Sequence, residues 1–390
     1  MKKVYCIALL IVNFYGLNAQ SYRKLHFRST LIDTHNDILT SAIDEGYSFD
    51  NNLKGKTHSD LARFAQGGVD VQIFSVWCDG TFGPGKAYAH ANRQIDTLYA
   101  TIARNPDKIA LTTTPAQMKA NLRAGKLSAM IGVEGGHMIE DKLENLNNLY
   151  RRGVRYMTLT WNNSNSWATS AMDETRKGDS LQNKGLTEFG KSVVRRMNEL
   201  GMIVDISHVG EKTFWDAINT TTKPVIASHS CAYALCPVFR NLKDDQIKAI
   251  ARNGGVIHLN FFSGFVDSTF NKRNREFSQL HKAEHDSLLK SGSNAESAEN
   301  YLDKKYAAEI NSLRPPLSLL LDHLDYFVKL AGINHVGLGS DFDGISSTPQ
   351  QLDDVTTYPL ITQAMRKRGY SKKDIRKILG GNFLRVWNAQ

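Results

Sequence analysis

Val69-Asp-Val-Gln-Ile-Phe-Ser-Val76 is a stretch rich in β-branched and aromatic residues, and it indicates the fold class. Its apolar side chains fall on both faces of an extended strand, because successive side chains of a strand point in opposite directions. A strand that is apolar on both faces needs cover on both, which is typical of a parallel sheet flanked by helices. A second stretch of this kind is Gly254-Gly-Val-Ile-His-Leu-Asn260. These stretches predict an α/β protein.

Short apolar runs of this type recur along the chain, and helical periodicity fills most of the intervals between them. The predicted strands are 30–37, 68–77, 127–135, 154–161, 202–209, 224–230, 255–262 and 335–341. The predicted helices are 86–104, 142–152, 187–200, 211–219, 242–253, 317–331 and 372–388. This strand–helix alternation over roughly 350 residues predicts a (β/α)8 barrel of the TIM type. An open doubly wound sheet is the alternative fold.

The composition is that of a folded domain. Of the 390 residues, 41% are hydrophobic and 22% are charged, which excludes intrinsic disorder. The net charge is +9, but the lysines and arginines lie in short, separated runs such as 272–275 and 366–368. Because nucleic-acid binding requires basic residues gathered on one surface, the sequence argues against a nucleic-acid partner.

The first residues have the pattern of a secretory signal peptide. A basic start, Met1-Lys2-Lys3, precedes an apolar run over 4–12 and a small residue, Ala19, at a suitable cleavage position. The apolar run is much shorter than the ~20 residues that a membrane-spanning helix needs. We therefore expect residues 1–19 to be removed, giving an exported protein with no stable membrane anchor. A retained anchor is the alternative.

Residues 20–390 are expected to form one barrel domain with a charged insertion at about 263–312, after the seventh strand. Long loops at the C-terminal ends of barrel strands often cover substrates. A substrate lid and a solvated surface loop are both consistent with the composition of this segment.

Residues that bind metals stand at the ends of several predicted strands. The first strand ends in Asp33-Thr-His35-Asn-Asp37, where His35 and Asp37 share one face and can chelate a single ion. Other strand ends contribute Glu134, His208, His229 and Asp341. The C-terminal ends of barrel strands are where such enzymes build their active sites. Imidazole and carboxylate ligands suit zinc, with manganese, iron and cobalt as alternatives.

In combination and order, these motifs resemble those of the membrane (renal) dipeptidases, a family of zinc peptidases among the amidohydrolase-like metal barrels. The resemblance runs from about Leu31 to Trp387. The motifs that carry it are Ile32-Asp-Thr-His35-Asn-Asp37, Gly132-Val-Glu134-Gly-Gly-His137, Gly153-Val-Arg-Tyr-Met-Thr-Leu-Thr160, Val204-Asp-Ile-Ser-His208, Ala227-Ser-His229-Ser230, Arg240-Asn241 and Gly337-Leu-Gly-Ser-Asp341-Phe-Asp343-Gly344.

The resemblance implies a dipeptidase that holds two zinc ions. By position, His35 and Asp37 would bind one zinc ion. His208 and His229 would bind the second, and Glu134 would bridge the two. A hydroxide that bridges the metals would then attack the peptide bond. Members of this family are also expected to be homodimers.

Two further residues gain roles from the resemblance. Asp341 corresponds to the acid/base residue at the end of the last strand. Arg240 corresponds to the arginine that pairs with the terminal carboxylate of the dipeptide. A guanidinium group binds a carboxylate through two parallel hydrogen bonds, which gives the preference for dipeptides a physical reason.

One position departs from the family pattern. The family carries a histidine directly after the Leu-Thr pair of the fourth strand, and this chain has Trp161 there. An indole N–H donates one hydrogen bond but cannot transfer that proton, so Trp161 is interpreted as a substrate-binding residue. One of the asparagines that follow is expected to donate a hydrogen bond in place of the histidine; the candidates are Asn162, Asn163 and Asn165. The departure leaves two alternatives open: hydrolysis of another amide or a lactam, and peptide binding with weak catalysis.

The remaining motifs receive structural interpretations. His281-Lys-Ala-Glu284-His285 matches the H-x-x-E-H zinc pattern, but it lies in the charged insertion without a third ligand nearby, which favours a solvated helix face. His26, His58 and His90 belong to no motif and are expected at the surface or in capping positions. Acidic residues beside the predicted ligands are expected to orient an imidazole or cap a loop; these are Asp33, Asp205 and Asp343.

Three cysteines remain after the predicted cleavage, and they are Cys78, Cys231 and Cys236. Three thiols cannot all pair with one another, so disulfides are not expected to hold the fold together. Whether two of them form a bridge is left open.

Overall fold

The computed structural model describes residues 21–291, 301–302 and 304–390. The predicted signal peptide, residues 1–19, and part of the predicted insertion lie outside the described residues. The described strands are β1 (Ile32–Asn36), β2 (Val71–Trp77), β3 (Ile109–Leu111), β4 (Leu127–Glu134), β5 (Val154–Thr158), β6 (Ile203–Asp205), β7 (Ile226–Ser230), β8 (Val256–Leu259) and β9 (Val336–Leu338).

These strands form a closed parallel barrel. They pair in the order β2-β1-β9-β8-β7-β6-β5-β4-β3, and an additional pairing between β2 and β4 closes the sheet. Eight strands make up the barrel, which confirms the predicted (β/α)8 fold. β3 was not predicted, and it pairs only with the beginning of β4, from Leu127 to Ala129. The eight barrel strands coincide with the predicted ones, but all are shorter.

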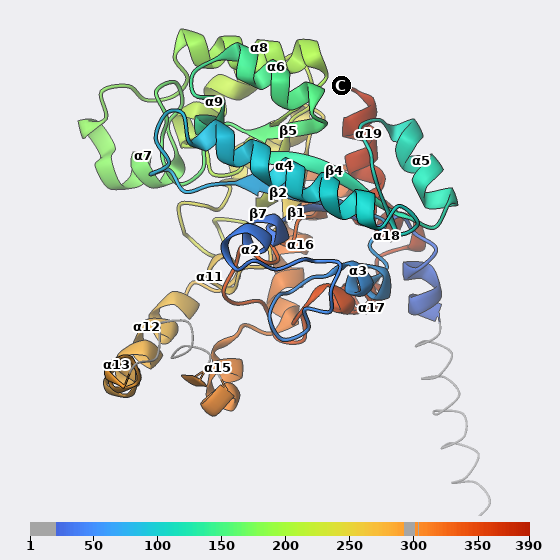
Figure 1. The fold of residues 1–390 in the computed structure, drawn as a ribbon, viewed down its shortest axis with the longest axis vertical. Coiled ribbons are helices and arrows are strands. Elements are labelled where there is room, and N and C mark those ends of the chain that lie inside the picture. The colour runs from blue at the N-terminus through green and yellow to red at the C-terminus, as the bar shows by residue number, and fades with distance from the viewer. Residues whose placement is uncertain (1–20, 292–300, 303) are drawn as a thin grey trace, which may run out of the picture.

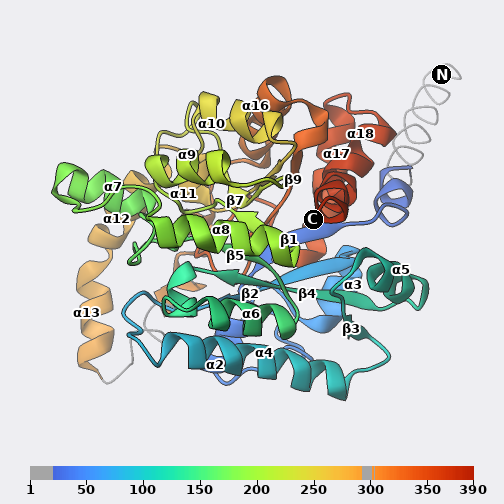
Figure 2. The ribbon, with the colours of Figure 1, turned by 90° about the horizontal axis from the view of Figure 1, so that it is seen from above.

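Helices surround the barrel (Figures 1 and 2). Those at or near predicted positions are α4 (Ala87–Arg104), α6 (Leu143–Arg151), α8 (Glu188–Leu200), α9 (Glu211–Thr220), α10 (Asp244–Arg252), α16 (Leu317–Ala331), α18 (Lys372–Arg376) and α19 (Asn382–Asn388). Additional helices are α2 (Ile38–Asp44), α3 (Leu61–Gly67), α5 (Pro115–Arg123), α7 (Ala171–Lys177) and α17 (Tyr358–Lys367). Within the described residues, no helix has both the length and the apolar character needed to span a membrane.

Helix α8 illustrates how local sequence sets these elements. The side chain of Thr187 accepts a hydrogen bond from the backbone N–H of Gly190, which caps the beginning of the helix. Val193, Val194 and Met197 lie on one helix face and are buried. Gly201 ends the helix at a φ of 72°, a left-handed conformation that glycine adopts without steric cost, and β6 begins two residues later.

The barrel interior is closed at the N-terminal ends of the strands by the last helix. Apolar side chains near the beginnings of strands, including Ile32, Val71 and Val256, form one buried cluster with Phe383 and Trp387 of α19. This packing leaves the opposite, C-terminal ends of the strands as the open mouth of the barrel. Figure 2 shows α7 and α12 at that end and α5 and α18 at the other.

The described part of the insertion after β8 is largely helical. It contains α11 (Ser263–Val266), α12 (Phe270–Leu280), α13 (Lys282–Lys290) and α15 (Ala307–Leu313). Helices α12, α13 and α15 project away from the body of the barrel (Figure 1). Helix α13 has no buried residue, as expected for a charged segment.

Candidate metal centre

The C-terminal ends of the strands bring the predicted ligands together. His35 and His229 lie on β1 and β7, and Glu134 ends β4. Asp37 follows β1 directly, and His208 lies in the turn after β6. The side chains form overlapping buried groups whose nitrogen and oxygen atoms lie within 4.8 Å of one another. These groups are His35, Asp37 and Glu134; Glu134, His208 and His229; and His35, His229 and Asp341.

Glu134 lies between two sets of these side chains. Its Oε2 atom is 3.5 Å from Nε2 of His35. Its Oε1 atom is 2.8 Å from Nε2 of His208 and 3.4 Å from Nε2 of His229. The two oxygens of one carboxylate therefore face two separate groups of donor atoms.

A tyrosine on β5 sets the tautomer of His35. The hydroxyl of Tyr156 donates its proton to the carbonyl oxygen of Thr34 at 3.1 Å. The same hydroxyl oxygen lies 2.8 Å from Nδ1 of His35 and therefore accepts a hydrogen bond from it. With the proton on Nδ1, the lone pair of Nε2 points into the cluster. A Cβ atom on Gly132 would lie 2.1 Å from the Tyr156 ring, so glycine makes room for this residue.

The other two imidazoles are held in the same way. Nδ1 of His208 lies 3.1 Å from Oδ1 of Asn162, which is only an acceptor, so that Nδ1 carries the proton. Nδ1 of His229 lies 2.8 Å from the hydroxyl oxygen of Ser228. Each histidine thus uses Nδ1 for a hydrogen bond at the rim of the cluster and turns Nε2 inward, the arrangement found in metal-binding histidines.

The cluster fits a bound cation. The Nε2 atoms of His208 and His229 are 2.9 Å apart, although both are expected to carry lone pairs and no proton. Nε2 of His35 and Oδ1 of Asp37 are buried and have no hydrogen-bond partner among the described residues. Lone pairs that face one another in a buried site need positive charge between them. Imidazole nitrogens and carboxylate oxygens are a ligand set that suits zinc.

Burial keeps two of these imidazoles neutral. Loss of solvent, assisted by the nearby Arg240 charge, lowers the pKa of His208 to about 4. Burial lowers the pKa of His229 well below its usual value. Metal ligation requires unprotonated nitrogen, so both residues have the protonation state of ligands at neutral pH.

Asp341 lies beside the cluster with one oxygen directed toward it. Its Oδ1 atom is 3.9 Å from Nε2 of His35. Burial, together with the negative charges of Asp37 and Glu134, raises the pKa of Asp341 to about 8. The raised pKa brings this carboxyl group closer to the range that favours general acid/base catalysis.

The backbone is strained at two of the predicted site residues. His208 and Asp341 have φ angles of 63° and 65°, in the left-handed region that non-glycine residues rarely adopt. Asp343 follows with a φ of 67°. Such conformations persist only when the surrounding contacts enforce them, and they are concentrated at functional sites.

Arg240 is buried next to the cluster. Its Nη2 atom donates a hydrogen bond of 3.2 Å to the carbonyl oxygen of His229. Its Nε atom is buried and has no hydrogen-bond partner in the part of the chain that the structure describes. Arg240 and His208 both line a cavity of about 310 Å³. A cationic donor thus remains free beside the histidines.

Trp161 contacts both an aromatic residue and the cluster. Its ring packs edge-to-face on Trp77 at a centroid distance of 4.9 Å and lies 6.4 Å from the ring of His208. Of the three asparagines that follow it, Asn162 holds His208. Asn165 donates to the carbonyl oxygen of Leu159 and accepts from two backbone N–H groups of the turn, which gives it a structural role.

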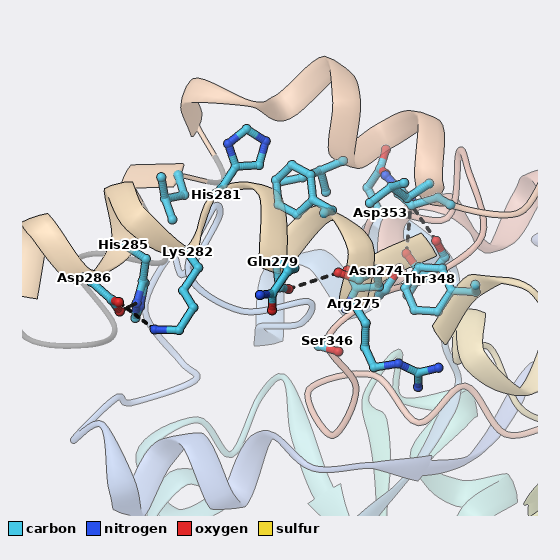
Figure 3. A pocket seen from close by; sticks show the side chains of 18 of the residues that line it. Asn274, Arg275, Gln279, His281, Lys282, His285, Asp286, Ser346, Thr348 and Asp353 are labelled. Carbon is cyan, nitrogen blue, oxygen red and sulfur yellow. Dashed lines mark hydrogen bonds and ion pairs between the residues drawn. The ribbon is translucent and has the colours of Figure 1, made fainter. Parts of the chain in front are cut away.

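The H-x-x-E-H pattern of the insertion does not assemble into a ligand group. Oε1 and Oε2 of Glu284 accept hydrogen bonds from Lys305 and Tyr306, at 2.5 and 2.7 Å. Among the described residues, neither His281 nor His285 belongs to a group of metal-type donors. Figure 3 shows both in the wall of a cavity of about 1060 Å³, where Lys282 is paired with Asp286.

The expectation of surface or capping positions was wrong for two histidines. His26 is fully buried, with its Nδ1 atom 2.8 Å from the Thr362 hydroxyl and its Nε2 atom 2.8 Å from the Gly67 carbonyl oxygen. His90 is also buried. Both make hydrogen bonds inside the fold.

The barrel and the histidine–carboxylate cluster at its open mouth define a metalloenzyme of the (β/α)8 class. Comparison with known protein families identifies the family. The chain belongs to the membrane dipeptidase family, peptidase family M19, whose family model matches residues 19–390. The predicted family is therefore confirmed.

Individual relatives cover nearly the whole chain. An uncharacterized dipeptidase of Schizosaccharomyces pombe is 32% identical over 391 residues, which span 95% of this chain and 83% of that protein. The crystal structure of the probable dipeptidase PvdM from Pseudomonas aeruginosa has a TM-score of 0.79 at 24% identity and covers 96% of this chain and 98% of its own.

A third relative is a metallopeptidase from Rhodobacter sphaeroides, liganded with a phosphinate mimic of the dipeptide L-Ala-D-Ala. Its structure has a TM-score of 0.74 at 24% identity and covers 93% of this chain and 99% of its own. With the family match, these relatives identify the chain as a metallopeptidase of the dipeptidase family.

Proposed function

We propose that this protein hydrolyses the peptide bond of free dipeptides with two zinc ions in the candidate metal centre. One ion is held by His35 and Asp37. The other is held by His208 and His229, and Glu134 is shared between them. The observation that carries the proposal is the orientation of Glu134, whose Oε2 atom faces His35 while its Oε1 atom faces the other two imidazoles.

Asp341 is proposed as the residue that moves the proton. Zinc supplies Lewis acidity toward water and toward the scissile carbonyl group. Oδ1 of Asp341 accepts a proton from the attacking water and delivers it to the nitrogen of the departing amine. This role is supported by the position of Oδ1, which lies 3.9 Å from Nε2 of His35, and by the hydrogen bond of 2.8 Å from Asn260 that holds Oδ2.

Arg240 is proposed to select substrates with a free carboxylate. Its Nε atom has no hydrogen-bond partner among the described residues, and His208 lies on the wall of the same cavity. Arg240 lies beside the proposed metal ligands. A guanidinium group in this place that binds the terminal carboxylate limits the substrate to two residues. The dipeptide mimic bound to the Rhodobacter sphaeroides relative is consistent with a dipeptide as the substrate.

Trp161 is proposed to form an apolar side wall for the substrate, together with Trp77, against which it packs. The wall replaces the proton carrier that the family pattern has at this position. It favours apolar substrate side chains, because aromatic rings bury apolar area efficiently.

The function is tested with purified residues 20–390 and a panel of L,L- and L,D-dipeptides, with N-acetylated and C-amidated versions as controls. Zinc-dependent cleavage that is lost on amidation supports both the metal centre and carboxylate recognition. Failure of zinc-loaded protein to cleave any dipeptide would favour the other amide or lactam substrates, or peptide binding without turnover.

Export and dimerisation complete the proposal. The pattern of residues 1–19 supports cleavage of a signal peptide after Ala19 and an exported, soluble mature protein. N-terminal sequencing of protein from the periplasmic or culture fraction tests the cleavage, and an uncut N-terminus contradicts it. Light scattering after gel filtration tests the dimer, and a mass of one chain contradicts it.

A further inference from the structure

Two similar aspartate–serine pairs lie next to the metal centre: Asp205 with Ser228, and Asp33 with Ser340. Asp205 accepts hydrogen bonds from both the backbone N–H and the hydroxyl of Ser228, at 2.9 and 2.6 Å. Asp33 accepts from both the backbone N–H and the hydroxyl of Ser340, at 2.9 and 2.7 Å. In each pair the serine directly precedes a site residue, which is His229 in the first pair and Asp341 in the second.

Asp205 is the more heavily bonded of the two carboxylates. Besides Ser228, it accepts from the hydroxyl of Thr158 at 2.5 Å and from the backbone N–H of Ser207 at 3.0 Å. It is fully buried, and its donors come from the end of β5, the middle of β7 and the turn that carries His208. One side chain thus ties together the segments that carry both histidines of one metal position.

The Ser228 hydroxyl passes this restraint on to the His229 ring. A hydroxyl has one proton, and the short bond to Asp205 uses it. The serine oxygen must then accept from Nδ1 of His229, which lies 2.8 Å away. The chain from Asp205 through Ser228 to His229 therefore leaves the Nε2 lone pair of His229 directed into the cluster.

The second pair has no such connection to an imidazole. The hydroxyl of Ser340 contacts Asp33 and, at 3.3 Å, the carbonyl oxygen of His35. The ring of His35 is instead oriented by Tyr156. Ser340 therefore provides a matched control: a buried serine bonded twice to a buried aspartate, without contact to a ligand ring.

We propose that Asp205 and Ser228 are positioning residues that set the zinc affinity of the His208–His229 position and leave the His35–Asp37 position unaffected. The inference rests on the proposed function, because it assumes two zinc positions. It adds residues that touch neither substrate nor metal. They act by fixing which nitrogen of His229 holds the proton and where its ring points.

Ser228→Ala and Ser340→Ala separate this role from general stability. Both variants remove one buried hydroxyl from a bond to aspartate, so we expect similar losses of melting temperature. Zinc content is measured by mass spectrometry across a series of chelator concentrations. Wild type and Ser340→Ala should keep two zinc ions per chain, whereas Ser228→Ala should lose one at a chelator concentration at least about 10-fold lower. Ser228→Thr, which keeps the hydroxyl, should restore retention.

The outcomes separate this inference from the proposed function. Wild-type protein that binds no zinc overturns the proposed function and this inference with it. Two zinc ions in wild type and unchanged retention in Ser228→Ala overturn the inference alone. If Ser228→Ala does not fold, histidine nitrogen NMR of wild-type protein decides. A proton on Nδ1 of His229 supports the inference, and a proton on Nε2 overturns it.

Discussion

Asn260 donates a hydrogen bond of 2.8 Å from its Nδ2 atom to Oδ2 of Asp341. The amide cannot turn over freely, because its own Oδ1 atom accepts from the backbone N–H of Phe262 at 2.6 Å. One oxygen of Asp341 is therefore fixed, and the other, Oδ1, is left on the side of His35. The two oxygens of this carboxylate have different tasks: one anchors the side chain and one faces the metal centre.

Replacing Asp341 by asparagine should separate zinc binding from turnover. Asn260 can still donate to an amide oxygen at position 341, so the fold and the zinc content should remain those of wild type. Without an ionisable group, kcat should fall by about 10²- to 10⁴-fold. Steady-state kinetics and zinc analysis of the same sample test this. A wild-type kcat would show that another group moves the proton.

Replacing Arg240 by methionine should affect substrates according to their C-terminus. For free dipeptides we expect kcat/KM to fall by about 100-fold, mainly through KM, because a charge-assisted hydrogen-bond pair is lost. C-amidated dipeptides lack the carboxylate and should be cleaved poorly by variant and wild type alike. Arg385→Met is the control, since Arg385 donates to the carbonyl oxygen of Gly254 at the opposite end of the barrel. An unchanged kcat/KM of Arg240→Met for free dipeptides would contradict the assignment.

Removing the metal should destabilise the protein. In the metal-free cluster, Asp37, Glu134 and Asp341 retain their mutual repulsion, and two imidazole lone pairs face each other. Zinc that binds only the folded state raises the free energy of unfolding by about 3 kcal/mol when the free zinc concentration is about 100 times its dissociation constant. We expect chelation to lower the melting temperature by about 5 °C and added zinc to restore it. An unchanged melting curve after verified removal would contradict a metal centre in this cluster.

Gly344 should not tolerate a side chain. A Cβ atom there would lie 2.2 Å from Oδ2 of Asp37 and 2.8 Å from Oδ1 of Asp341. Gly344→Ala should therefore displace both carboxylates and reduce zinc retention and kcat together. Gly83→Ala is the control, because its Cβ atom would have no neighbour within 4 Å. Full activity in Gly344→Ala would mean that these two carboxylates are not required in their present positions.

Asp70 should make stability depend on pH. Burial raises the pKa of this carboxyl group to about 6, against the backbone hydrogen bond from Leu31 that favours the ionised form. The folded protein holds this proton more tightly than the unfolded chain, whose aspartates titrate near 4. The contribution of protonated Asp70 to the free energy of unfolding is therefore complete below about pH 4 and is lost as pH rises through about 6.

Asp70→Asn removes this dependence and keeps an oxygen that can accept from Leu31. We expect the variant to be about 1–2 kcal/mol more stable than wild type at pH 8, with no gain at pH 4. Urea unfolding at the two pH values measures the difference. A gain of equal size at both would show that the carboxyl group does not titrate as described.

Local patterns in the sequence account for the barrel and for most of the metal centre. The spacing of His35 and Asp37 is a property of a single strand, and the C-terminal ends of parallel strands meet at one mouth. Neighbouring strand ends therefore predict neighbouring side chains. β3 escaped prediction because its apolar run, Ile109–Leu111, stops at Thr112, whereas the equally short β6 and β9 lie within the longer predicted runs 202–209 and 335–341.

Contacts across long sequence separations were not predictable in the same way. Tyr156 reaches His35 only because β5 lies across the barrel interior from β1. His26 is buried because Thr362, 336 residues away, provides a partner for its ring. The hydrogen bond from Asn260 to Asp341 was not predictable either, because the sequence shows only that Asn260 stands at the end of a strand. Such residues depend on strand register and on the final packing, which one sequence does not encode in any short pattern.

Helix α19 has a consequence for how this chain is made. Phe383 and Trp387 complete the apolar interior at the N-terminal ends of the strands, and β1 is paired with β9 from the far end of the sequence. During synthesis, β1 has no β9 to pair with until the segments between them and β9 itself have been made, so the barrel closes late. Until then the edge of β1 is open to aggregation, because an unpaired strand edge can pair with another chain.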